Sequence, residues 1–144
     1  MMKLFFKVGL IILVLNCTFS CNKQCNVKGI LVSELLIVVS KEKSINYCDL
    51  LSSALNGNNE AIKELSLLEF NDSTGYDHGS VLVELILKIG EDKYLKGVEP
   101  LNVKQKKLVQ SYLDVGLEYG NISHIKEKRL DKVFPTIDTY LTME

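Results

Sequence analysis

The N-terminus constrains the chain most, because it has the layout of an export signal. The segment Met1–Lys7 carries Lys3 and Lys7 and no acid, and the apolar run Val8–Leu15 follows it. About eight apolar residues is a normal length for the core of a signal peptide, whereas a helix needs roughly 20 to span a bilayer. We therefore expect residues 1–20 to be a signal peptide that is removed from the folded protein.

The apolar run continues as Asn16-Cys-Thr-Phe-Ser-Cys21, in which the small residue Ser20 directly precedes Cys21. This segment resembles the lipobox of bacterial lipoproteins, where a cysteine after a small residue is lipidated and becomes the first residue of the mature chain. The resemblance covers residues 1–21. It implies a precursor whose mature form is held in the bacterial cell envelope, in the periplasm or at the surface, by lipid on Cys21.

Two alternatives to lipidation at Cys21 stay open. Thr18 stands where the lipobox usually has an aliphatic residue, and Cys17 is a competing acceptor with the aliphatic Val14 three positions before it. The second alternative is an ordinary signal peptide cut near Ser20, which leaves a secreted, soluble protein.

The mature chain from Cys21 to Glu144 has 124 residues, which suits one domain with a real core. We expect a short tether over residues 21–28 and a folded domain over residues 29–144. Without Lys3 and Lys7 the chain has 15 basic residues against 18 acids, a net charge of about −3. Arg129 is the only arginine in the sequence, so the forked side chains that recognise phosphates and base edges are nearly absent. Nucleic acid is therefore not an expected partner.

Two cysteines, Cys25 and Cys48, remain in the mature chain after Cys21. In an oxidising compartment they would pair, and the bridge would contribute roughly 3 kcal/mol by the loop-entropy model. The alternative is a core thiol at Cys48 and a free Cys25 in the tether. No Cys/His set has the spacing of zinc ligands, and no phosphate loop or other cofactor motif is present. We expect neither a metal nor a cofactor.

Apolar periodicity and turn residues predict an all-α fold, a single bundle or irregular array of about five to seven helices. Asn56-Gly57 ends one predicted helix, and Asn58 or Asn59 can cap the next. Residues 71–75 are polar and turn-forming, and Pro135 suits the first turn of a closing helix. The helices are expected at residues 45–55, 61–68, 77–89, 103–119, 122–133 and 135–141, with a short amphipathic turn at 91–96.

The segment at residues 30–39 fits either a buried helix or a central strand, because it is apolar on nearly every side. Residues 82–92 resemble the second helix and turn of a HEAT or armadillo unit. One such segment does not make a repeat.

His78 beside Asp77 is the one candidate for catalytic chemistry, since a carboxylate can orient a histidine that acts as a general base. Neighbouring residues on a helix do not face each other. We therefore expect Asp77 to be a helix N-cap and His78 an exposed residue of the first turn. An envelope enzyme that uses His78 is the least favoured function.

Two surface features suggest partners. Lys104, Lys106 and Lys107 form a cluster that could touch an anionic surface such as the membrane. Tyr76, Tyr94 and Tyr140 fit the apolar stripes least well, and tyrosine is enriched at interface cores. The favoured function is therefore a membrane-anchored, non-enzymatic module that binds another envelope protein. A periplasmic immunity protein that neutralises a toxin is the alternative, and a strongly charged contact face would favour it.

Overall fold

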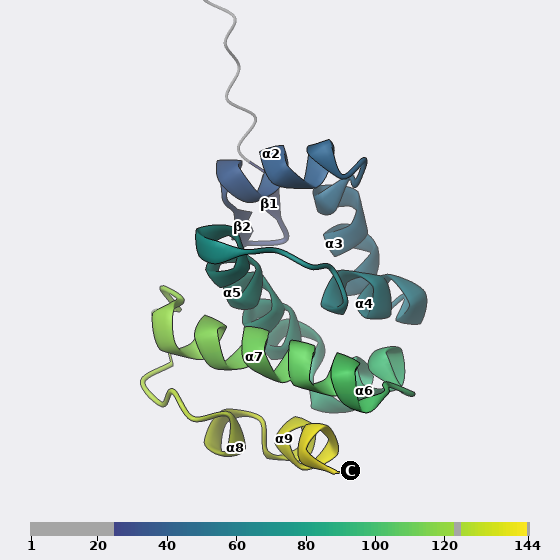
Figure 1. Ribbon diagram of the computed structural model, residues 1–144, viewed down its shortest axis with the longest axis vertical. Helices are drawn as coiled ribbons and strands as arrows, with labels where there is room; N and C mark the ends of the chain where they lie inside the picture. The colour runs from purple at the N-terminus through teal and green to yellow at the C-terminus, as the bar shows by residue number, and fades with distance from the viewer. Residues whose placement is uncertain (1–24, 123–124, 144) are drawn as a thin grey trace, which may run out of the picture.

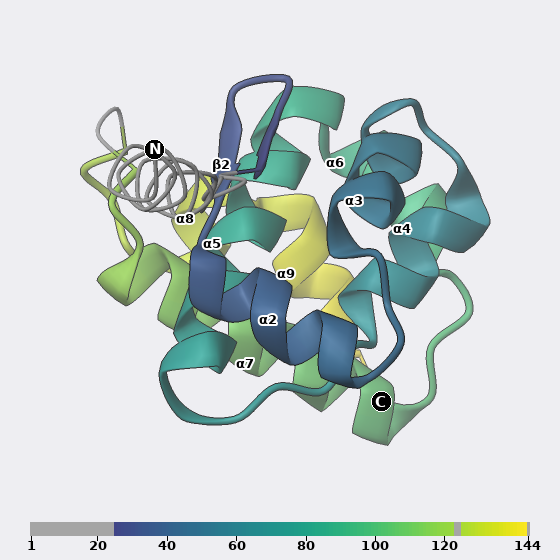
Figure 2. The same cartoon turned by 90° about the horizontal axis from the view of Figure 1, so that it is seen from above.

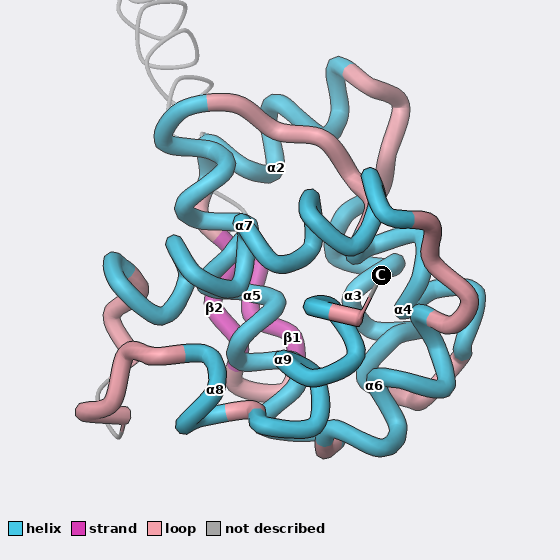
Figure 3. The backbone as a smooth tube through the Cα atoms, turned by 60° about the horizontal axis from the view of Figure 1, so that its bottom comes forward, coloured by secondary structure: helices cyan, strands magenta, loops and turns pink. Residues whose placement is uncertain are grey.

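The computed structural model describes residues 25–122 and 125–143. Cys17, Cys21 and the expected signal peptide lie outside the described residues. The described chain is all-α apart from one short hairpin, as Figure 3 shows. The predicted fold class is therefore confirmed.

The described chain begins with a β-hairpin. Strand β1 (Cys25–Val27) pairs antiparallel with β2 (Ile30–Val32), and Cys25 lies opposite Val32. Lys28 and Gly29 form the turn with φ of 51° and 88°, the positive values that two-residue hairpin turns need. Residues 25–28 were expected in the tether, and the structure corrects this, because backbone pairing to β2 orders them.

Helix α2 (Glu34–Glu42) follows β2 directly, and the Ser33 side chain caps it by accepting from the Leu36 amide at 3.2 Å. Residues 30–39 are therefore a strand and then a helix, a combination of the two alternatives. Leu36 and Ser40 are buried on the inner side of α2. Figure 2, which views the molecule from above, shows α2 in front of the other helices.

Helices α3 (Tyr47–Leu55) and α4 (Asn59–Ser66) form the helical hairpin that the sequence predicts. Gly57 turns the chain with φ of 82°, and the Asn58 side chain accepts from the Ala61 amide at 3.0 Å to cap α4. Of the two candidate caps, Asn58 is the one used.

The longest helices, α5 (Asp72–Ile89) and α7 (Val103–Tyr119), cross through the middle of the molecule (Figure 1). They approach closely at Gly79 and Gly116, where a Cβ added to Gly79 would lie 2.3 Å from the Tyr112 carbonyl oxygen. Helix α7 has the predicted bounds and a capping box between Asn102 and Gln105. Helix α5 begins at residue 72 and not near residue 77, because its first turns pack against α7.

The remaining helices are α6 (Glu91–Val98), α8 (Leu130–Val133) and α9 (Pro135–Thr142). The closing helix from Pro135 is confirmed. The helix expected over residues 122–133 is wrong, since only its last four residues are helical. Before α8 a Glu127 side-chain oxygen accepts from the backbone amides of Lys128 and Arg129, which ties this stretch into a turn.

Candidate functional site

His78, the catalytic candidate, lies inside the core and not on the surface. Its side chain is fully buried, and its Nδ1 shares a hydrogen bond of 2.7 Å with the Tyr47 hydroxyl. The rings of Tyr47, Phe70 and Tyr112 surround it, with centroids 4.8–5.8 Å from the imidazole. Nε2 has no hydrogen-bond partner among the described residues.

Burial lowers the pKa of His78 from 6.5 to about 3, and the nearby Leu65 carbonyl counteracts this only in part. The imidazole is therefore neutral at physiological pH, and no substrate reaches it from solvent. The expectation of an exposed first-turn histidine is wrong, because α5 begins five residues earlier than predicted and turns His78 inward. Asp77 is not an N-cap either, since its carboxylate accepts a hydrogen bond from the Ser33 hydroxyl.

The three candidate interface tyrosines differ in environment. Tyr94 is fully buried and shares a hydrogen bond of 2.8 Å with the Ser66 hydroxyl, and burial raises the pKa of Tyr94. Its assignment to an interface is wrong, because α6 packs that face against α4. Tyr140 is half-buried, and its hydroxyl accepts from the Leu101 amide at 2.9 Å. Tyr76 is 48% exposed.

Tyr76 has an aromatic neighbour that the sequence did not single out. The ring of Tyr119, at the end of α7, lies 5.2 Å from the Tyr76 ring, and its side chain is 68% exposed. We call these two residues the tyrosine surface. Tyr119 follows the buried Tyr112 by seven residues, a spacing that predicts the same face of α7, but Tyr119 is the last residue of the helix and remains exposed.

Next to the tyrosine surface lies a hollow of about 240 Å³ between α5 and α7, here called the α5–α7 hollow. Its lining residues are Phe70, Asp72, Gly75, Tyr76, Ser111, Tyr112 and Val115. The Tyr112 hydroxyl is held between the Phe70 amide and carbonyl, at 2.8 and 3.1 Å. The hollow therefore has an aromatic wall and one carboxylate, that of Asp72.

Two acids, Glu69 and Asp72, and one lysine, Lys43, lie around the α5–α7 hollow, so its net charge is slightly negative. Glu69 lies close enough to Tyr112 to help raise the pKa of its hydroxyl, after burial. The Lys43 ammonium lies 5.8 Å from the centroid of the Phe70 ring, a distance at which an aromatic face attracts a cation.

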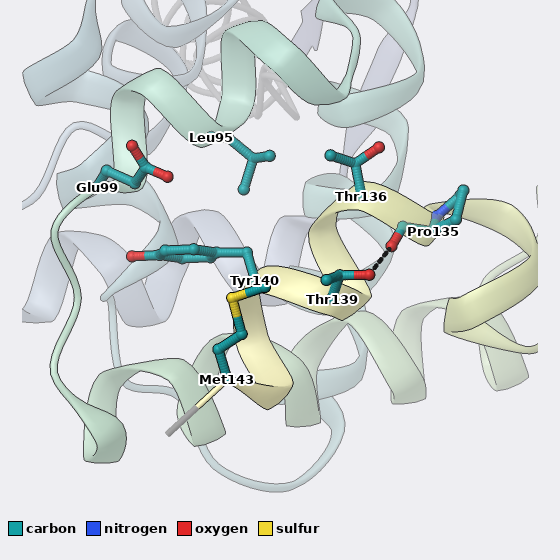
Figure 4. A pocket seen from close by; sticks show the side chains of 7 residues that line it. All are labelled: Leu95, Glu99, Pro135, Thr136, Thr139, Tyr140 and Met143. Carbon is teal, nitrogen blue, oxygen red and sulfur yellow. Dashed lines mark hydrogen bonds between the residues drawn. The ribbon is translucent and has the colours of Figure 1, made fainter.

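A larger, open hollow of about 520 Å³ lies between α6 and α9 (Figure 4). Thr136 and Tyr140 of α9 and Met143 after it line one side of the hollow, and Leu95 of α6 lies across from them. The Thr139 hydroxyl donates to the Pro135 carbonyl at 2.8 Å and is thereby occupied within its own helix. The polar groups here do not converge on one point, so the hollow lacks the features of a catalytic pocket.

The lysine cluster does not act as one free patch. The Lys106 ammonium donates to the Met143 carbonyl at 2.9 Å and lies 4.5 Å from the centroid of the Tyr140 ring. Lys104 and Lys107 are exposed. Lys106 therefore joins α7 to the end of α9, and two lysines remain for an anionic surface.

Cys25 and Cys48 form a disulfide with a Cα–Cα distance of 6.4 Å. The bridge fastens the first residue of β1 to α3. Of the two alternatives for these cysteines, the structure therefore has the disulfide and not two free thiols.

Among residues 25–122 and 125–143, no group of three or more His, Cys, Asp and Glu side chains could hold a metal ion. The same part of the chain contains no helix both long and apolar enough to cross a membrane. Comparisons with protein-family models, curated proteins and solved structures found no match.

Proposed function

We propose that this protein is exported, anchored by lipid on Cys21, and acts as a non-enzymatic helical module that binds another protein of the cell envelope. The observation that carries the proposal is the tyrosine surface beside the α5–α7 hollow. Tyr76 and Tyr119 expose 48% and 68% of their side chains, although each would be more stable with its ring buried.

Tyrosine suits a contact surface because it offers a large, rigid area with a polar end. The adjacent hollow can accept one protruding side chain, and its aromatic wall and acids define which one. Asp72 lines the hollow and Glu69 lies beside Tyr112. A partner that inserts an arginine or lysine from an otherwise apolar segment would fit both the rings and the charge.

The disulfide supports export. A bridge such as Cys25–Cys48 persists in the periplasm and outside the cell but is rare in the cytosol. It also begins four residues after the proposed lipidated cysteine, so the anchor is joined to the domain through a covalently fastened strand. The resemblance of residues 1–21 to a lipoprotein signal supplies the anchor itself.

A toxin-neutralising immunity protein is the second candidate, favoured by the acids at the α5–α7 hollow. Glu69 and Asp72 would complement a basic surface on such a toxin. A toxin encoded beside this gene, inhibited by the purified chain, would decide for this narrower function.

The anchor is tested by the intact mass of the protein from the membrane fraction of a bacterial host, wild type beside Cys21→Ala. We expect a chain that starts at Cys21 with added acyl chains, lost in the variant. An unmodified chain that starts near Cys21 in the soluble fraction would refute the anchor.

The binding surface is tested by placing a photo-crosslinking amino acid at Tyr119, with Val103 as the matched exposed control. We expect a discrete cross-linked partner from position 119 only. The purified partner should then bind the wild-type chain, and Tyr119→Ala should weaken binding by about 10- to 100-fold, as for an interface hot spot. Equal cross-linking from both positions, or unchanged affinity, would refute the surface.

A further inference from the structure

We infer that the outer side of β2 and α2 rests on the bilayer that carries the anchor. Leu31, Leu35 and Val38 are 53%, 45% and 48% exposed there, and we call these three residues the membrane face. The inference rests on the proposed lipid anchor at Cys21 and names the surface that the anchor brings to the lipid.

The membrane face is where exposed apolar side chains concentrate in the described chain. Three large exposed hydrophobic residues of the described chain fall within eight consecutive positions, at 31, 35 and 38. Leu35 and Val38 are one turn apart on α2, on the side opposite the buried Leu36 and Ser40. Leu31 points away from the core that its neighbours Ile30 and Val32 enter. These three residues lie on two consecutive elements, β2 and α2.

The length of the tether decides what covers this face. Cys21 and Cys25 are four residues apart, and four fully extended residues reach at most about 14 Å. Cys25 cannot move away from the domain, because it is paired with Val32 and bridged to Cys48. A lipid on Cys21 therefore keeps β1, and the strand β2 paired with it, within about 14 Å of the headgroup layer, which is itself roughly 5–7 Å thick in each leaflet, and α2 follows β2 directly.

Lys41 is the lysine of α2 that can reach a headgroup layer beside the membrane face. It is exposed, as are the acids Glu34 and Glu42 at the two ends of the helix, whereas the Lys28 ammonium donates to Asn56 and the Lys43 ammonium lies over the Phe70 ring. Lysines beside an apolar patch can extend their ammonium groups to phosphate while their stems lie along the acyl boundary.

The lysine cluster at the start of α7 lies at the other end of the molecule. Lys106 contacts Met143 after α9, and Figure 1 shows α9 at the bottom and α2 at the top. A lipid anchor near β1 therefore directs the Lys104–Lys107 region away from the bilayer. This orientation distinguishes the membrane face from the lysine cluster as the lipid contact.

The chain contains no tryptophan, so one introduced indole reports one position. The lipidated protein is purified from membranes as Leu35→Trp and as Val103→Trp, the latter at a matched exposed site on α7. Each is reconstituted into vesicles of phosphatidylethanolamine and phosphatidylglycerol that contain brominated acyl chains. We expect at least twofold stronger quenching, and a blue-shifted emission, for L35W than for V103W.

Equal quenching of the two indoles in a lipidated, vesicle-bound chain would overturn the membrane face and leave the anchor standing. A mass without acyl chains would overturn the anchor and the membrane face together. Val38→Trp is the second probe on the same face if L35W does not reach the wild-type helix content, and it should be quenched as L35W is. If V103W is quenched more strongly than L35W, the start of α7 and not the membrane face lies on the lipid.

Discussion

Protonation of His78 should couple the stability of the fold to pH. The imidazole is fully buried among three aromatic rings, and burial lowers its pKa to about 3. In the unfolded chain the same group returns to its ordinary pKa of 6.5. Between pH 6.5 and 3 the unfolded state therefore binds a proton that the folded state does not.

The sign and size of the effect follow from this difference. The free energy of unfolding is highest above pH 6.5 and falls as the pH drops, by about 1.4 kcal/mol per pH unit once the unfolded histidine is mostly protonated. At pH 4.5 the loss is about 3 kcal/mol, a large part of the stability of a domain of this size. Glutamates of ordinary pKa, about 4.3, begin to bind protons at the low end of this window, and burial raises the pKa of Asp114, so the histidine contribution is the difference between the wild-type chain and a His78 variant.

Urea unfolding followed by circular dichroism between pH 4.5 and 7.5 measures this slope on the Cys21→Ala chain, which carries no lipid. His78→Gln should flatten the slope, because glutamine can share the hydrogen bond with Tyr47 but does not titrate. His124→Gln is the control for the only other histidine and should keep the slope. A flat wild-type profile, or an NMR titration of the His78 ring with a midpoint near 6.5, would refute the argument.

Two further perturbations test the packing. Gly79→Ala places a Cβ 2.3 Å from the Tyr112 carbonyl oxygen and should destabilise the fold by about 2–3 kcal/mol. Thermal unfolding should show a lower midpoint for this variant, whereas the control Ser111→Ala, at an exposed position of α7, should change the midpoint little. An unchanged midpoint for the Gly79→Ala variant would contradict the close crossing of α5 and α7. Cys48→Ser opens the bridge to Cys25 across 23 residues and should cost about 3 kcal/mol in urea unfolding. If the Cys48→Ser variant loses as much unfolding free energy as the wild-type chain loses when it is reduced, the bridge is supported. If the variant loses none, the bridge is refuted.

The elements that sequence predicts well carry their own local signals. Helix α7 begins at an Asn102 cap, and α9 begins with Pro135 at its first position. The turn between α3 and α4 has Gly57 at a positive φ. In each case the residues that end or begin the helix act through backbone geometry that does not depend on distant contacts.

The elements that sequence misses depend on contacts made far along the chain. The strands β1 and β2 have three residues each, too few for a periodic pattern, and a disulfide to α3 fastens the first of them. The start of α5 contains polar and small residues that favour a turn, yet Thr74 and Gly75 are buried. Gly75 lies against the Tyr112 ring. The hydroxyl of the same tyrosine binds the backbone of Phe70, which is 42 residues away from Tyr112 in the sequence. Tertiary packing here overrides local propensity.

The candidate site changes for the same reason. Starting α5 at residue 72 turns His78 into the core and leaves Tyr76 exposed beside Tyr119. Burial of Tyr94 follows from α6 lying on α4, where Gly97 approaches Ile62 so closely that an added Cβ would lie 2.6 Å from that side chain. Residue type alone could not distinguish the exposed Tyr76 from the buried Tyr94.

The two proposed surfaces constrain each other through a single contact. The Asp77 carboxylate accepts from the Ser33 hydroxyl, so the residue after Tyr76 is bonded to the N-cap of α2. The tyrosine surface therefore lies close to the end of the domain that the proposed anchor would hold on the bilayer. A partner that docks there must itself be bound to the membrane or reach its surface, which makes the lipidated protein, and not its soluble form, the proper bait for finding it.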